Sequence, residues 1–237
     1  MPQPTAMLLA HADGSPASAL FTPGALGSTD PFGHARRIAY LGTDGMAAGV
    51  IQANGAFVVD DYPHIEMLVI HAGRVTLQDE DLTLELNPGD SLVIGRGTAF
   101  QGQAEPNSLW AFCAQTQAAG ERNPGLTLLD PLSPVAPSTA PEAEILLSRA
   151  PQCRSHNTFA DSASDLRIGI WDSTPYTRRA RPHTLHELMH LIEGSVTLQA
   201  ADGSDLRVNT GDTVFVPQGA PCAWKSTVYV RKFYVVK

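Results

Sequence analysis

The stretch PHTLHELMHLIEGSVTLQA (residues 182–200) decides the fold, because residues 63–79 repeat it in weaker form as PHIEMLVIHAGRVTLQD. Glu187 of the later copy aligns with Glu66 of the earlier one. Further landmarks then coincide, namely Gly194 with Gly73, the VTLQ tetrapeptides at 196–199 and 75–78, and, after one inserted residue, the Gly-Asp pairs at 211–212 and 89–90. The chain is therefore an internal duplication, and each copy constrains the interpretation of the other.

The pentapeptide HELMH (residues 186–190) matches the HExxH pattern, in which a helix presents two histidines to zinc and a glutamate as general base. The same place in the first copy reads IEMLV (residues 65–69), which lacks both histidines and is rich in β-forming residues. Two copies of one fold share their secondary structure, so we predict a strand in both. On a strand, His186 and His190 point to the face opposite Glu187, and we expect no zinc-protease chemistry from them.

Short apolar runs separated by Gly, Pro, Asn and Asp turns follow one another through both copies, and no convincing helix remains. This pattern predicts an all-β sandwich or barrel. The segment DPLSPVAPSTAP (residues 130–141) contains four prolines and is typical of a semi-rigid linker. We predict a first domain at residues 6–117, a proline-rich linker at 118–141 and a second domain at 142–237.

Composition and cysteine content favour a protein of a reducing compartment. Cys113, Cys153 and Cys222 are an odd, sparse set that implies no disulfide framework. No basic segment followed by an apolar run opens the chain, and no stretch approaches the roughly 18 apolar residues of a membrane span. We therefore expect a cytoplasmic protein without membrane contacts.

The formal net charge of −8 is carried by the first half of the chain. Residues 1–120 contain 4 Arg and Lys against 12 Asp and Glu, whereas residues 121–237 contain 12 of each class. An acidic chain without a basic face argues against nucleic-acid binding. The local exception is the cluster Arg178, Arg179 and Arg181. It is either a solvated strand edge or a device that attracts an anionic ligand.

The order of glutamate, six residues, glycine, hairpin, Gly-Asp turn and Pro-x-Gly turn resembles the two sequence motifs of the cupins. That resemblance implies two tandem cupin barrels, each a double-stranded β-helix or jelly roll. The run GDTVFVPQGAPCAWK (residues 211–225), followed by VRKFY (residues 230–234), is similar more narrowly to the ureidoglycine aminohydrolase-like cupin family. The narrower match covers most of residues 160–237, while residues 36–113 match only the general cupin pattern.

The resemblance also implies a set of site positions. In the second copy the metal-ligand positions of a cupin are taken by Arg181, His183, Glu187 and Cys222. Arginine cannot ligate a metal, so His183, Glu187 and Cys222 are the candidate ligands for a divalent Mn, Zn, Fe or Ni ion. A site without metal is the alternative.

In the first copy the same positions hold Asp60, Tyr62, Glu66 and Phe100. A phenylalanine where a ligand should project predicts a barrel that is plugged and purely structural. We expect His64 and His71 to be structural as well.

Two functions follow from the resemblance and stay open at this point. One is a metal-dependent hydrolase that releases ammonia from a small ureido acid, with Glu187 and Arg181 as catalytic residues and Arg181, Arg179 and Trp224 contacting an anionic substrate. The other is a non-catalytic, metal-free protein that binds a small ligand. Without metal, Arg181 should pair with Glu187, either directly or through a water or a bound anion, because neither charge can be buried alone. We expect the two barrels to form an intramolecular pseudo-dimer, with a homodimer left open.

Overall fold

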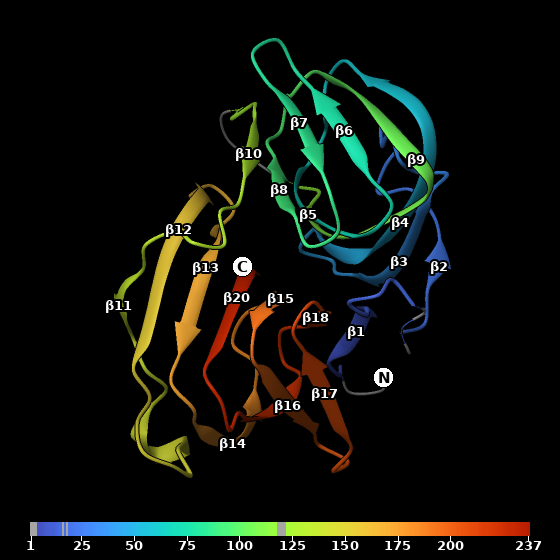
Figure 1. The fold of residues 1–237 in the computed structure, drawn as a ribbon. Coiled ribbons are helices and arrows are strands. Elements are labelled where there is room, and N and C mark those ends of the chain that lie inside the picture. Colours follow the sequence, from blue (N-terminus) through green and yellow to red (C-terminus); the bar gives the residue numbers. More distant parts are fainter. Residues whose placement is uncertain (1–3, 16, 18, 118–121) are drawn as a thin grey trace. The chain divides into compact units, whose positions relative to one another are not determined.

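The structure is a computed structural model that describes residues 4–15, 17, 19–117 and 122–237 (Figure 1). Its regular structure is almost entirely antiparallel β, which confirms the predicted all-β class. The helical part of the described residues is one short 3-10 segment, η1 (Ala143–Ile145). Within that described part, no helix is long and apolar enough to cross a membrane.

The described chain divides into two compact units. The N-terminal unit comprises Leu9–Asp130 and Asp161–Leu166. The C-terminal unit comprises Pro131–Ala160, Arg167–Lys237 and the described residues before Leu9.

The N-terminal unit is built on one sheet in the order β10-β8-β5-β9-β4-β3-β2, with β6 paired to both β7 and β9. The long strands β4 and β9 pair along most of their lengths and lie side by side in Figure 1. The strands of this unit are β2 (Thr22–Pro23), β3 (Arg36–Leu41), β4 (Met46–Val59), β5 (Ile65–Ala72), β6 (Val75–Gln78), β7 (Thr83–Leu86), β8 (Ser91–Ile94), β9 (Phe100–Gln115) and β10 (Leu126–Leu128).

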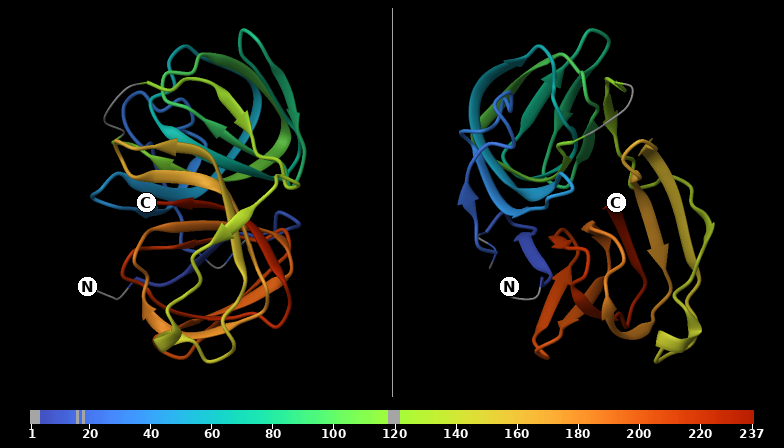
Figure 2. Two further views of the ribbon diagram at one scale, coloured as in Figure 1. Left: turned by 90° about the vertical axis from the view of Figure 1, so that its left-hand side faces the viewer. Right: turned by 180° about the vertical axis from the view of Figure 1, so that it is seen from behind.

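The C-terminal unit contains a seven-stranded sheet, in the order β1-β18-β15-β20-β13-β12-β11, and a four-stranded sheet, in the order β14-β19-β16-β17. The views in Figure 2 show its strands curving around a common interior. The strands are β1 (Met7–Ala10), β11 (Ala136–Ser138), β12 (Cys153–Asp161), β13 (Leu166–Ser173), β14 (Thr177–Pro182), β15 (Glu187–Glu193), β16 (Ser195–Ala200), β17 (Asp205–Asn209), β18 (Thr213–Val216), β19 (Pro221–Lys225) and β20 (Val230–Val236).

Two short strands lie within the described part of the predicted linker (residues 118–141), and residues 118–121 lie outside that part. Strand β10 pairs with β8 in the N-terminal unit, and β11 pairs with β12 in the C-terminal unit. Proline is tolerated in β11 because this strand is at the edge of its sheet, where one side needs no ladder hydrogen bonds. The proline-rich composition thus marks an edge strand as well as a connection.

The HELMH segment ends in a strand, as predicted from the duplication. Strand β15 begins at Glu187 and pairs with β18 on one side and β20 on the other. His186 and His190 are buried and stack on Phe215 and Phe233. Neither histidine lines the cavity described below. The zinc-helix interpretation of this motif therefore has no structural counterpart.

The interior of the N-terminal unit is filled by aromatic side chains. Phe100 is only 4% exposed and contacts Phe57 and Tyr62, with ring centroids 6.3 and 5.8 Å apart. Phe32 and Trp110 extend the same cluster through edge-to-face contacts. Phe100 therefore lies in the core where a plug was predicted.

We predict that Phe100→Ala lowers the free energy of unfolding by about 3–5 kcal/mol, because the substitution leaves a cavity in a packed core. Val58, also in the N-terminal unit, is 72% exposed, so Val58→Ala is a matched control that should change stability by less than about 0.5 kcal/mol. Urea unfolding measures both. Equal stabilities of the two variants would show that Phe100 does not fill the interior.

Candidate functional site in the C-terminal unit

A cavity of about 670 Å³ lies between the two sheets of the C-terminal unit. Strands β12, β13, β15 and β20 line it from the larger sheet, and β14, β16 and β19 line it from the smaller one. Its volume is in the range that holds a small molecule. The duplicated segment therefore brings Glu187, at the start of β15, to the wall of a real pocket.

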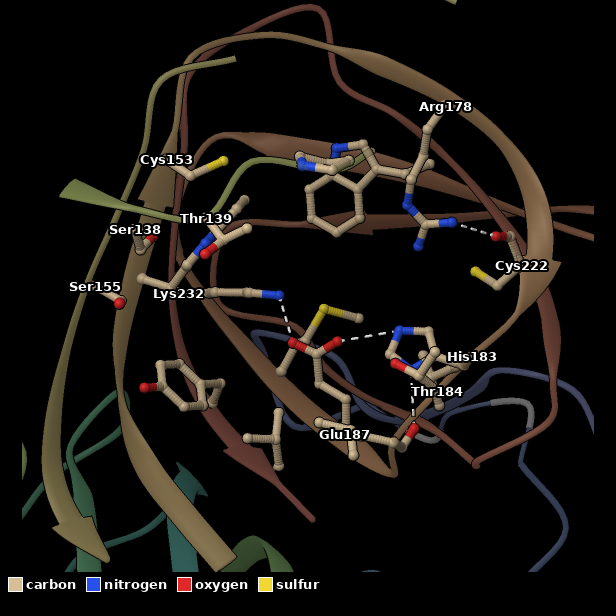
Figure 3. Close-up of a pocket in the computed structure, with 18 of the residues that line it drawn as sticks. Ser138, Thr139, Cys153, Ser155, Arg178, His183, Thr184, Glu187, Cys222 and Lys232 are labelled. Carbon is tan, nitrogen blue, oxygen red and sulfur yellow. Dashed lines mark hydrogen bonds and ion pairs between the residues drawn. The ribbon is translucent and has the colours of Figure 1, made fainter. Parts of the chain in front are cut away.

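Glu187 is held by two basic side chains inside this cavity. Its Oε1 accepts a 2.6 Å hydrogen bond from Lys232 Nζ, and its Oε2 lies 3.2 Å from His183 Nε2. Figure 3 shows Glu187 between these two residues, with Arg178 and Cys222 bordering the same space. The side chains of Glu187 and Lys232 are 14% and 7% exposed, so the ion pair is largely shielded from solvent.

These contacts determine the charge of Glu187. Burial alone would raise the pKa of this carboxyl, but Lys232 and His183 outweigh burial and hold the pKa well below its ordinary value. Glu187 is therefore ionised throughout the neutral range. A proton-donating role for it is excluded there.

His183 follows β14, and its ring is oriented by the backbone. Its Nδ1 lies 2.8 Å from the carbonyl oxygen of Leu185, which can only accept a hydrogen bond, so Nδ1 carries a proton and donates it. The other ring nitrogen, Nε2, is thereby directed at Glu187. The sequence placed His183 and Glu187 together correctly.

Lys232 is the residue that sequence reasoning missed. It lies on β20, and its ammonium is 4.7 Å from the ring centroid of Trp171 and 5.2 Å from that of Trp224. Two aromatic faces and one carboxylate thus compensate its charge. The available signal was the basic pair Arg231 and Lys232 in the otherwise apolar run VRKFYVV.

A β-bulge in β14 decides which arginines reach the cavity. Arg178 pairs with Trp224 and Arg181 pairs with Cys222, so three steps along β14 match two steps along β19. The extra residue changes the alternation of side chains, and both Arg178 and Arg181 line the cavity while Arg179 is exposed.

The bulge corrects two expectations. Arg179, predicted to contact substrate, points to solvent, and the buried Arg178 takes its place on the cavity wall. A direct pair of Arg181 with Glu187, one of the predicted forms of their contact, does not form. Arg181 Nη1 instead lies 3.3 Å from an oxygen of Glu142, and Lys232 occupies the place beside Glu187. Strict alternation could not have revealed this, because a bulge leaves no reliable mark in a single sequence.

Cys222 and Trp224, both on β19, line the cavity as predicted. Burial raises the pKa of the Cys222 thiol. Trp224 stacks on Tyr176 with ring centroids 5.5 Å apart and donates a hydrogen bond from Nε1 to Ser226 Oγ. Its contact with a ligand stays a prediction.

The residues present do not fit a divalent metal. The backbone contact of His183 is typical of a metal-ligating histidine. However, Lys232 places a positive charge against Glu187, and Cys222 Sγ is directed at the carbonyl oxygen of Ala223 at 3.3 Å. Within the described ranges no three His, Cys, Asp or Glu side chains are grouped so that they could hold a metal ion.

The equivalent position in the N-terminal unit carries a similar ion pair. Glu66 is fully buried, and its Oε2 lies 2.9 Å from Nη2 of Arg36, which also pairs with Asp30. Burial raises the pKa of Glu66, and Arg36 opposes this shift. Tyr62 is buried beside this pair and accepts a hydrogen bond from Arg36, whereas Asp60 is exposed.

The predicted structural histidines of the N-terminal unit are both buried. The Nδ1 of His71 lies 2.8 Å from the carbonyl oxygen of His11. His64 packs against Tyr62, and burial lowers its pKa to about 4, so it is neutral at physiological pH.

Comparison with known proteins places this architecture among the cupins. Residues 162–234 match the model of the EutQ-like cupin domain. No match was found among curated proteins.

Solved structures resemble this chain over most or all of its length. A protein of unknown function of the DUF861 family from Pseudomonas syringae pv. tomato str. DC3000 is 55% identical, with a TM-score of 0.96 over 99% of this chain and 100% of that one. A cupin 2 conserved barrel domain protein from Leptotrichia buccalis is 14% identical, with a TM-score of 0.58 over 85% and 86% of the two chains. The protein Ylba from E. coli, of family DUF861, is 12% identical, with a TM-score of 0.53 over 100% and 92%. The last two likenesses concern the fold alone.

We predict that Lys232→Met lowers the free energy of unfolding by about 3–5 kcal/mol, because it leaves the Glu187 carboxylate without its main counter-charge. The double variant Lys232→Met with Glu187→Gln should recover most of this loss, since the stranded charge is then absent. Lys225→Met, at an exposed lysine of β19, is the matched control and should stay within about 0.5 kcal/mol of the parent. Urea unfolding of these four proteins and of the single variant Glu187→Gln measures the coupling. Additive losses in the double variant would contradict the ion pair.

The low pKa of Glu187 also predicts a pH dependence. The pKa of Glu187 is lower in the folded protein than its value of about 4.5 in the unfolded chain. The ionised carboxylate therefore stabilises the folded state above about pH 4.5, and this stabilisation is lost as the pH falls toward the folded pKa. Between about pH 5 and 2 the parent should therefore lose stability more steeply than Glu187→Gln, by up to about 1.4 kcal/mol per pH unit. Thermal unfolding across this range measures the difference, and parallel curves would refute it.

Proposed function

Since the chain belongs to the DUF861 family of cupin-type proteins, we propose that it binds a small anionic molecule in the cavity of its C-terminal unit without the help of a metal ion. We further propose that the two units are tandem cupin barrels, which makes the protein a bicupin. The internal duplication and the cupin fold of the solved structures support this second statement.

The observation that carries the proposal is the state of Arg178. Its side chain is buried, and its Nη1 donates to the carbonyl oxygen of Cys222 at 2.7 Å and to that of Arg179 at 3.4 Å. In the part of the chain that the structure describes, no carboxylate pairs with this guanidinium. A buried cation without a counter-charge is costly, and a bound anion would remove that cost.

The rest of the cavity has the same charge preference. Four Arg or Lys side chains line it against two carboxylates, although the whole chain carries a net charge of −8. The cationic residues are Arg167, Arg178, Arg181 and Lys232, and the acidic ones are Glu142 and Glu187. Such an excess inside a walled pocket attracts anions.

The chemistry of the walls indicates a small carboxylate. A guanidinium binds a carboxylate through two parallel hydrogen bonds, and Trp171, Tyr176 and Trp224 offer apolar faces to the remainder of the ligand. The likeness of residues 160–237 to ureidoglycine aminohydrolase-like cupins makes ureido acids the first compounds to test. Hydrolysis through a bound metal is not supported, because His183 and Glu187 lack a third donor and Glu187 is already neutralised.

The test uses the intrinsic fluorescence of Trp171 and Trp224, which line the cavity. We expect N-carbamoylglycine, malonate or oxalate to change this fluorescence saturably, and the neutral amide N-carbamoylglycinamide to have no effect. Arg178→Met should weaken binding by about 1.5–3 kcal/mol, which is roughly tenfold or more, because a charge-assisted hydrogen-bond pair is lost.

Arg179→Met is the matched control, since it removes the same charge from the adjacent exposed position. It should leave the affinity unchanged. If both variants lose the same affinity for carboxylates, the effect comes from the net charge of the protein and not from a contact with Arg178. If no carboxylate of the panel binds the parent protein, the proposed function is wrong.

A further inference from the structure

We infer that the ammonium of Lys232 is the resident cation of the C-terminal cavity and excludes a divalent metal from Glu187 and His183. The inference deepens the proposed function, since it assigns the cation of the same cavity, but it stands on separate contacts. It predicts that removing this one side chain raises the affinity of the cavity for zinc.

The first argument is the position of the charge. Lys232 Nζ lies 2.6 Å from Glu187 Oε1, while His183 Nε2 lies 3.2 Å from the other oxygen of the same carboxylate. A metal bound by Glu187 and His183 would have to share this carboxylate with an ammonium at contact distance. The repulsion between the two cations, in a site largely closed to water, opposes such sharing.

The second argument is how firmly the lysine is held. Its ammonium faces the rings of both Trp171 and Trp224, and its side chain is only 7% exposed. A lysine that moved away from Glu187 would give up these three partners together. The ammonium is therefore a built-in part of the wall rather than a mobile surface charge.

The third argument comes from the N-terminal copy. There the aligned Glu66 is also neutralised by a basic side chain, because Arg36 Nη2 lies 2.9 Å from its Oε2. The Arg36 guanidinium also faces an aromatic ring, that of Phe112, at 4.4 Å. The two cations come from different strands, β3 and β20. In both copies, therefore, the aligned glutamate is neutralised by a basic side chain of the protein, although that side chain comes from a different strand in each copy.

The test is zinc binding, measured by calorimetry against a competing chelator. The parent should bind Zn²⁺ in the cavity at least tenfold more weakly than Lys232→Met, in which Glu187 and His183 are released and Cys222 lines the same space. Added Zn²⁺ should also raise the melting temperature of Lys232→Met, and not that of the parent.

Three controls test whether the higher zinc affinity of Lys232→Met comes from the cavity. Lys225→Met removes an exposed lysine and should bind zinc as the parent does. Adding His183→Ala or Glu187→Gln to Lys232→Met should abolish the gain. Should Lys232→Met fail to fold, Lys232→Gln, which keeps a donor for Glu187 but removes the charge, takes its place with the same expectation.

Two outcomes overturn the inference. One is a parent protein that takes up one Zn²⁺, Mn²⁺ or Ni²⁺ per chain and loses it on His183→Ala. The other is a folded Lys232 variant whose zinc affinity equals that of the parent. Carboxylate binding that depends on Arg178 would then still support the proposed function. Conversely, zinc gain without any carboxylate binding would support the role of Lys232 and reject the proposed function.

Discussion

The structure of the site depends on the compensation of one buried carboxylate, Glu187, by the ammonium of Lys232. Removing a carboxylate from water is unfavourable by several kcal/mol unless a counter-charge is supplied, as an order-of-magnitude estimate. Because Lys232 supplies that charge from β20, Glu187 stays ionised in the cavity and His183 is aligned against it. The remaining cations, above all Arg178, then line the cavity without a carboxylate partner of comparable proximity among the described residues, which is the basis of the proposed anion binding.

Both copies neutralise a shielded glutamate with a basic side chain, but their interiors differ. In the N-terminal unit, Arg36 forms ion pairs with both Glu66 and Asp30. Aromatic side chains including Phe100 fill the interior. In the C-terminal unit the position of Phe100 is taken by the much smaller Cys222, and a cavity of about 670 Å³ remains. The two copies therefore differ in their interiors, since one is filled by aromatic side chains and the other contains a cavity.

Backbone irregularity also decides which side chains serve the site. A regular β14 would have directed every second residue into the cavity, but the bulge between Arg178 and Arg181 admits both of these and exposes Arg179. One extra residue on one strand therefore sets the balance of positive charge within the pocket. This explains how an acidic chain contains a cationic cavity, and it links local backbone geometry to ligand preference.

The sequence by itself determined the all-β class, the duplication, the strand nature of HELMH, the proximity of His183 to Glu187 and the buried place of Phe100. These depend on periodicity and on comparison of two copies, which are local and visible in one chain. Only the tertiary structure decided the partner of Glu187, the exchange of Arg179 for Arg178, and the strands within the expected linker. The physical reason is that Lys232 lies 45 residues from Glu187 along the chain and meets it only through strand pairing, while a bulge depends on the register of its neighbour.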